Sequence, residues 1–153
     1  MMADTDTREL SVEAFIDAPP KKVWDIMTER QEEWWCPTPW RAKIDHQDRR
    51  AGGRCDMTFH GPDGEQMPQN GIYLAYEPGR RFVITDAVTG DFEPQGPFMI
   101  GIWEIMPQGE GTLYRASARH WTDEAKQQHA EMGFEEGWAA CARQLKELVE
   151  SGS

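Results

Sequence analysis

Between residues 41 and 120 the chain alternates polar and apolar residues in short segments, and glycines and prolines separate these segments. In the segment 54–60, for example, Cys55, Met57 and Phe59 alternate with more polar residues. A period of two is typical of a strand with one buried face, and short turns between successive strands make neighbours antiparallel. The pattern therefore predicts an antiparallel meander. Its strands are predicted at 41–47, 54–60, 67–77, 80–87, 98–106 and 112–120, with a loop at 89–97.

The residues before this region predict one further strand and two short helices. Residues 8–17 alternate in the same way and predict a strand. Asp17 is followed by two prolines, which is a helix-start signal, so a short helix is predicted over 19–28. A second short helix is predicted over 29–35, because Pro37 cannot continue a helix.

The C-terminal part predicts one long helix, from Thr122 to about residue 149. Its apolar residues recur at spacings of four and three, which places them on one stripe of a helix. An antiparallel sheet with a long helix covering one face is an α+β layer architecture. We therefore predict a single α+β domain over 8–149, with flexible tails at 1–7 and 150–153. The stripe consists of Phe134, Trp138, Cys141, Leu145 and Leu148.

Two glycines, Gly133 and Gly137, lie within this predicted helix. In a helix interior each glycine costs roughly 1 kcal/mol relative to alanine, so their presence needs a reason. Three interpretations stay open. The glycines permit close packing of the helix on the sheet, they leave room for a ligand beside Phe134 and Trp138, or they permit a kink.

Composition excludes several classes of partner. The formal net charge of −11 argues against nucleic acid, because affinity for phosphates depends on lysine and arginine. It also disfavours anionic membranes, which attract basic clusters. The first residues lack the apolar core of a signal peptide, and no apolar run reaches the roughly 18 residues of a membrane helix. We therefore predict a cytoplasmic protein that binds neither nucleic acid nor membrane.

Motifs for catalysis and metal binding are missing from the sequence. The three cysteines are far apart and form no CxxC pair, so neither a zinc site nor a disulfide framework is predicted. The chain has no GxSxG, HExxH, P-loop or GxGxxG motif. We therefore predict no catalytic residue, no metal ion and no cofactor.

Several short motifs, in order along the chain, resemble those of a known superfamily. They are Asp17-Ala18-Pro19 before Val23-Trp24, Trp34-Trp35 before Pro37, Gly52-Gly53-Arg54, Gly61-Pro62-Asp63-Gly64 with Gly71-Ile72-Tyr73, Thr85-Asp86, and Gly133-Phe134-Glu135-Glu136-Gly137-Trp138. The chain resembles the SRPBCC superfamily of START-like, birch-pollen-allergen-like helix-grip domains. Within it, the chain is most similar to bacterial single-domain proteins related to the C-terminal domain of the ATPase activator of the ninety-kilodalton heat-shock chaperone. The resemblance covers roughly residues 8–149.

The resemblance implies a helix-grip fold, in which a curved antiparallel sheet of six or seven strands wraps around the C-terminal helix and leaves a cavity. The apolar strand faces then suggest which side chains point inward, with Ile72 and Leu74 among them. The inward face around Trp103 cannot be chosen from the sequence. His120 is in phase with Tyr114 and is expected near the cavity mouth. The predicted ligand-binding residues are Trp35, Met57, Phe59, Leu74, Ile84, Trp103, Tyr114, His120, Phe134 and Trp138.

These observations predict a protein that binds a small hydrophobic molecule in the cavity. Two other functions stay open, because a fold does not determine a function. Some superfamily members are cyclases or hydrolases, which would need an acid or base with a perturbed pKa inside the cavity. The resemblance also implies contact with the chaperone. However, the eukaryotic activator has an additional N-terminal domain, for which 153 residues leave no room. The sequence identifies neither the ligand nor the oligomeric state.

Overall fold

The computed structural model describes residues 8–96 and 99–151. They form a seven-stranded sheet in the order β1-β7-β6-β5-β4-β3-β2, with all neighbours antiparallel. The predicted meander is confirmed, and β1 closes it by pairing with β7. The predicted tail at 1–7 and the residues 97–98 and 152–153 lie outside the described residues. The strands are β1 (Glu9–Ile16), β2 (Arg41–Gln47), β3 (Arg54–His60), β4 (Gln66–Glu77), β5 (Arg81–Thr85), β6 (Ile100–Gln108) and β7 (Gly111–Arg119).

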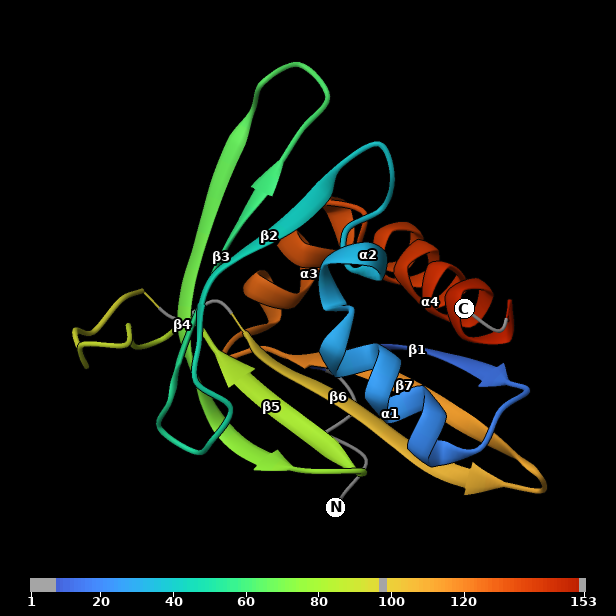
Figure 1. Ribbon diagram of the computed structural model, residues 1–153. Helices are drawn as coiled ribbons and strands as arrows, with labels where there is room; N and C mark the ends of the chain where they lie inside the picture. The colour runs from blue at the N-terminus through green and yellow to red at the C-terminus, as the bar shows by residue number, and fades with distance from the viewer. Residues whose placement is uncertain (1–7, 97–98, 152–153) are drawn as a thin grey trace.

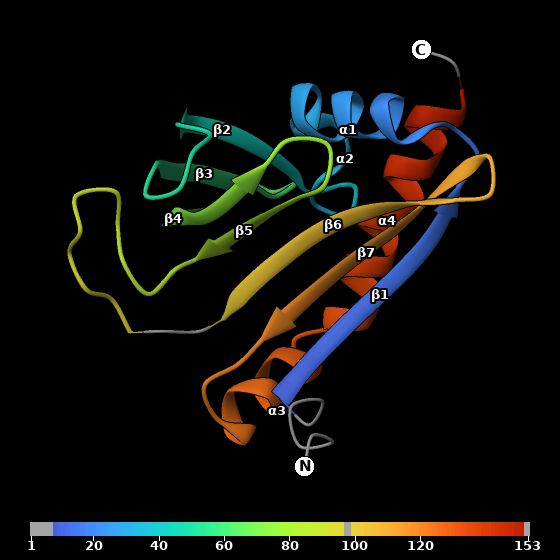
Figure 2. The same cartoon turned by 90° about the horizontal axis from the view of Figure 1, so that it is seen from below.

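Helices lie on one side of this sheet and confirm the α+β architecture. Figures 1 and 2 show the sheet curving around them, with α4 running beside β1. Four of the five residues in the predicted apolar stripe of α4 are buried, since Phe134, Trp138, Cys141 and Leu145 are at most 8% exposed, and the fifth, Leu148, is partly buried against the core. No helix within the described ranges is long and apolar enough to cross a membrane. The helices are α1 (Pro20–Glu29), α2 (Gln31–Trp34), α3 (Asp123–Glu131) and α4 (Phe134–Glu150).

The predicted long C-terminal helix is interrupted at Gly133. Its start is as predicted, because Thr122 Oγ1 accepts a hydrogen bond from Ala125 N at 3.0 Å and caps α3. Helix α3 then ends at Glu131, and Gly133 adopts a φ of +94° before α4 begins at Phe134. The prediction of one continuous helix to about residue 149 is therefore wrong. A glycine in the left-handed conformation commonly ends a helix, and this one separates α3 from α4.

Replacing Gly133 by alanine is expected to lower the free energy of unfolding by about 1–2 kcal/mol, the cost of an L-residue in the left-handed region. Gly137→Ala is the matched control. A Cβ at Gly137 would have Pro37 Cγ as its nearest neighbour, at an ordinary 3.8 Å, and alanine is the better helix former by about 1 kcal/mol. Urea unfolding of the two variants measures the contrast. Equal stabilities would contradict a structural role for the conformation of Gly133.

Strand β4 presents a different face to the core than the alternation predicts. Tyr73 is 1% exposed and belongs to the core, whereas Leu74 is 44% exposed. Ile72 pairs with Arg54 and lies with it on the outer face of the sheet. Cys55 and Met57 belong to the core and pair with Gly71 and Gln69, so Tyr73 continues the inward face of β4 and Leu74 lies on the opposite face by alternation. The prediction that Ile72 and Leu74 point inward is therefore wrong.

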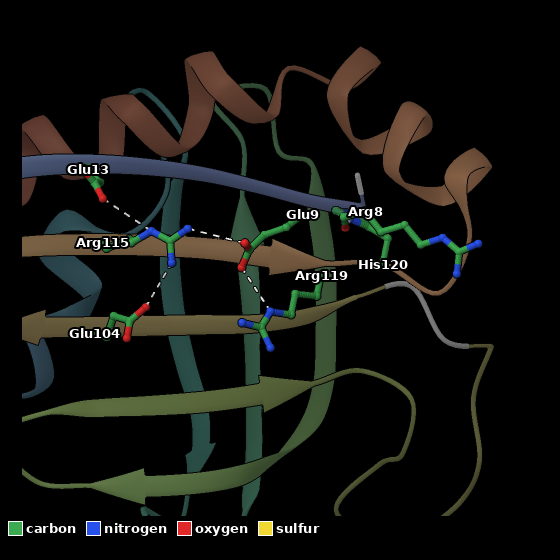
Figure 3. Close-up of polar contacts among 7 residues, drawn as sticks. All are labelled: Arg8, Glu9, Glu13, Glu104, Arg115, Arg119 and His120. Atoms are coloured by element: carbon green, nitrogen blue, oxygen red, sulfur yellow. Dashed lines mark hydrogen bonds and ion pairs between the residues drawn. The ribbon is translucent and has the colours of Figure 1, made fainter. Parts of the chain in front are cut away.

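Ion pairs cover the outer face of the sheet around β7. Arg115 on β7 lies 3.4–3.5 Å from carboxylate oxygens of Glu9, Glu13 and Glu104. Arg119 lies 3.1 Å from Glu9 (Figure 3). Residues on one face of neighbouring antiparallel strands lie close enough for such pairs. Since this face is charged, an apolar site has to be sought on the concave side.

Candidate ligand pocket

A hollow of about 210 Å³ lies between the concave face of the sheet and the helices. A second hollow of about 300 Å³ lies beside it, at the junction of α3 and α4. The two hollows share wall residues, and together they are called the pocket below. A cavity of about 150 Å³ can already hold benzene, so the pocket has room for a molecule with one or two rings. The shared residues are Trp35, Phe59, Met67, His129, Met132 and Trp138.

Three tryptophans form the aromatic wall of the pocket. Trp103 on β6 and Trp138 on α4 are stacked, with ring centroids 5.3 Å apart. Trp35, which follows α2, meets both rings edge-on, at 5.3 Å from Trp103 and 5.1 Å from Trp138. Stacked and edge-on pairs at these distances are favourable aromatic geometries. The arrangement also shows that Trp103 faces inward, which the sequence left open.

Methionines form much of the remaining wall. Met57 on β3, Met67 on β4, Met99 before β6 and Met132 after α3 all line the first hollow. Met67 is 45% exposed and Met132 is 64% exposed, so both lie at the rim. Methionine is unbranched and polarisable, and it adapts to irregular apolar surfaces. The wall can therefore adjust to the shape of a bound molecule.

A pair of buried histidines adds a polar group to the pocket wall. His120 follows β7 and lies beside Arg8 (Figure 3). Its Nδ1 is 2.9 Å from the Arg8 carbonyl oxygen, and its Nε2 is 2.9 Å from His129 Nδ1. Because a carbonyl only accepts, His120 Nδ1 donates to it, and in the neutral pair His120 Nε2 then accepts from His129 Nδ1. Burial and the neighbouring His120 lower the pKa of His129 to about 4, so this ring is neutral at pH 7.

The structure places most of the predicted ligand-binding residues around the pocket. Leu74 and Tyr114 are the exceptions. Leu74 lies on the outer face of β4, next to the inward Tyr73, and Tyr114 is fully buried beneath the wall, against Trp34. His120 lies behind His129 and reaches the pocket through it. The predicted residues that line the pocket are Trp35, Met57, Phe59, Ile84, Trp103 and Trp138 in the first hollow and Phe134 in the second.

Sequence reasoning missed several residues of the wall, above all the polar ones. Gln31 and His129 are 6% and 7% exposed, yet they line the pocket. One weak signal was present for Gln31, which precedes Trp35 by one helical turn and so shares its side of α2. Further polar lining residues are Gln69, Asn70, Thr85 and Asp86.

The cysteines near the pocket are not activated. Cys36 N donates a hydrogen bond to Cys141 Sγ at 3.2 Å, and both residues line the second hollow. Burial raises the pKa of each thiol to about 12. Because the thiolate is the reactive form, neither is a nucleophile at neutral pH. Among residues 8–96 and 99–151, no three His, Cys, Asp or Glu side chains are grouped so as to hold a metal ion.

Comparison with known proteins identifies the family. The family model for Activator of Hsp90 ATPase homolog 1-like proteins matches residues 17–150. The chain belongs to this family. The match confirms the resemblance to the SRPBCC superfamily and gives the pocket its context, since it lies between the sheet and the C-terminal helix of this Activator of Hsp90 ATPase homolog 1-like domain. No curated protein matches the chain.

Solved structures of bacterial proteins share the fold of this domain over nearly its whole length. A protein from Nitrosomonas europaea is 30% identical, with a TM-score of 0.86, and the alignment covers 95% of this chain and 96% of that one. One from Mycobacterium smegmatis is 28% identical, with a TM-score of 0.78 and coverages of 95% and 92%. An AHSA1 protein from Silicibacter pomeroyi is 16% identical, with a TM-score of 0.71 and coverages of 95% and 99%, and this match supports the fold alone.

Proposed function

We propose that this domain binds a small, mostly apolar molecule in the pocket between its sheet and α4. The observation that carries the proposal is the hollow of about 210 Å³ beside a wall of tryptophans and methionines. Concave, mainly apolar pockets with a few polar groups are the usual small-molecule sites. Among the described residues that line the two hollows there is no lysine or arginine. A neutral ligand therefore suits the pocket better than an anion.

A thermal-shift screen of neutral one- and two-ring compounds tests this function. A ligand at 100 times its Kd adds about 2.7 kcal/mol to the free energy of unfolding. For a domain of this size, that corresponds to a rise in Tm of roughly 5–10 °C. Quenching of tryptophan fluorescence should follow the same concentration dependence, since Trp35, Trp103 and Trp138 line the pocket. If no apolar compound changes either signal, the proposal is wrong.

A hydrolase or cyclase is the second candidate, because the pocket wall contains a buried base. His129 lines both hollows and is paired with His120 at 2.9 Å, and a perturbed titratable group in a cleft is a common sign of catalysis. Hydrolysis of a naphthyl ester by the wild-type protein, lost in His129→Gln, would support it. Tight ligand binding without turnover would favour a binding protein.

Two further predictions stay open to test. The domain is predicted to contact the chaperone named in the family description, which a pull-down and an ATPase assay would test. A cytoplasmic location also stays a prediction.

A further inference from the structure

Gln31 brings an amide group into the apolar pocket. It is the first residue of α2, it is 6% exposed, and it lines the first hollow one turn before Trp35. A polar group in an apolar wall costs free energy unless its hydrogen bonds are made. The partners of the two ends of this amide therefore decide what the pocket can recognise.

A chain of hydrogen bonds fixes the orientation of the Gln31 amide. Arg49 Nε donates to Gln47 Oε1 at 3.0 Å, and Gln47 Nε2 donates to Gln31 Oε1 at 3.0 Å. The guanidinium of Arg49 is itself held by Thr28 O at 2.7 Å and by the Glu29 carboxylate at 3.0 Å. Since arginine can only donate, the order of donors and acceptors cannot be reversed. Gln31 Oε1 is thus engaged, and its amide nitrogen is the group that remains.

The amide nitrogen of Gln31 has no hydrogen-bond partner among the residues that the structure describes. It is also not one of the side-chain atoms that are both fully enclosed and unpaired, such as Tyr114 Oη. It therefore still reaches open space, and the space next to Gln31 is the first hollow. An unpaired and largely buried donor gains free energy by meeting an acceptor.

We propose that Gln31 Nε2 donates a hydrogen bond to the ligand, so that the pocket selects ring molecules with a neutral acceptor oxygen, such as an aryl ketone. The proposal rests on the ligand-binding function proposed above. The rings would pack on the wall of Trp35, Trp103 and Trp138. A carboxylate fits less well, because Asp86 lines the same hollow and the described lining residues include no lysine or arginine. An uncompensated charge in an apolar site is costly.

Isothermal titration calorimetry with three matched naphthalenes tests the selection. 2-Acetylnaphthalene carries the acceptor, 2-isopropenylnaphthalene has nearly the same shape without it, and 2-naphthoate carries a negative charge. We expect the wild-type protein to bind the ketone about tenfold more tightly than the alkene, the usual effect of one such hydrogen bond, and the naphthoate most weakly. Gln31→Leu should bring the ratio of ketone to alkene to about one and leave alkene binding in place. Gln128→Leu, at an exposed amide outside both hollows, is the control that should keep the ratio.

Gln47→Glu tests the positioning of the amide. Glutamate can still accept from Arg49, but it offers Gln31 an acceptor instead of a donor. The Gln31 amide should then turn its nitrogen toward residue 47 and its oxygen toward the pocket. The preference between 2-acetylnaphthalene and 2-naphthol, which donates a hydrogen bond, should shift about tenfold toward the naphthol. A merely structural role of Gln47 would weaken both compounds equally.

The outcomes separate the two proposals. Equal binding of ketone and alkene by the wild-type protein overturns the role of Gln31 and leaves ligand binding intact. Unchanged selectivity in both Gln31→Leu and Gln47→Glu also overturns the role of Gln31. Two variants are used because a folding defect in one of them would leave the other to decide. Failure of all four naphthalenes to bind contradicts the ligand-binding function itself, and the role of Gln31 with it.

Discussion

Gly137→Leu is expected to weaken ligand binding at least tenfold while changing the free energy of unfolding by less than about 1 kcal/mol. Gly137 lies on α4 and lines the second hollow with Phe134 and Trp138. The nearest neighbour of a Cβ at this position is Pro37 Cγ, at 3.8 Å, so a larger side chain would enter the hollow rather than press on the sheet. Leucine is also the better helix former, by up to about 1 kcal/mol, which offsets small strains.

Calorimetric titration and urea unfolding of the same preparation measure the two effects together. Glu136→Leu is the matched control, because it adds the same side chain to an exposed position of α4. This control should bind ligand as the wild-type protein does. A loss of several kcal/mol in Gly137→Leu with unchanged ligand affinity would mean that packing, and not a ligand, needs the space beside this glycine.

The two glycines show what a helical pattern can predict and what it cannot. The position of Gly137 at the edge of the apolar stripe followed from helical periodicity, and the residue does line the pocket. Gly133 lies in the same pattern, but its φ of +94° ends one helix before the next begins. Periodicity records which side of a helix is apolar. It carries no information on the backbone angles of a residue that has no side chain.

The sheet was predictable because alternation and turns are local, whereas the exceptions depend on distant contacts. Leu74 alternates with Tyr73 as expected, but the pairing of β4 with β3 turns the face of Tyr73 inward and that of Leu74 outward. The buried amide of Gln31 has its hydrogen-bond partner, Gln47, sixteen residues later in the chain, on β2. His129 is buried against His120 and the α4 aromatics. Much of the apolar wall could therefore be predicted from the sequence, whereas the polar groups within it could not.

Acidification from pH 6.5 to pH 4.5 is expected to destabilise the domain by on the order of 2 kcal/mol through His129. Burial, together with the neighbouring His120, lowers the pKa of His129 to about 4, while an unfolded histidine titrates near 6.5. Between these values the unfolded chain binds more protons than the folded one. The stabilisation is therefore complete above pH 6.5 and is lost as the pH falls toward 4. One pKa unit corresponds to about 1.4 kcal/mol, and access of solvent from the pocket reduces the full effect.

Urea unfolding at half-unit steps of pH measures this loss, and His129→Gln should flatten the profile because glutamine can still donate to His120 but does not titrate. His46→Gln removes a solvent-exposed imidazole and leaves the pair in place, so it should retain the fall. The carboxylates Glu33, Glu77 and Glu150, whose pKa values arginine or lysine partners lower, lose their stabilising effect only below about pH 5, so the steps from pH 6.5 to about pH 5 report on the histidine. A profile of the wild-type protein as flat as that of His129→Gln would contradict a neutral, buried His129.

The ring of His129 contacts Phe134 and Trp138, so a proton on it would also disturb the wall of the pocket. Ligand affinity should then fall over the same interval of pH.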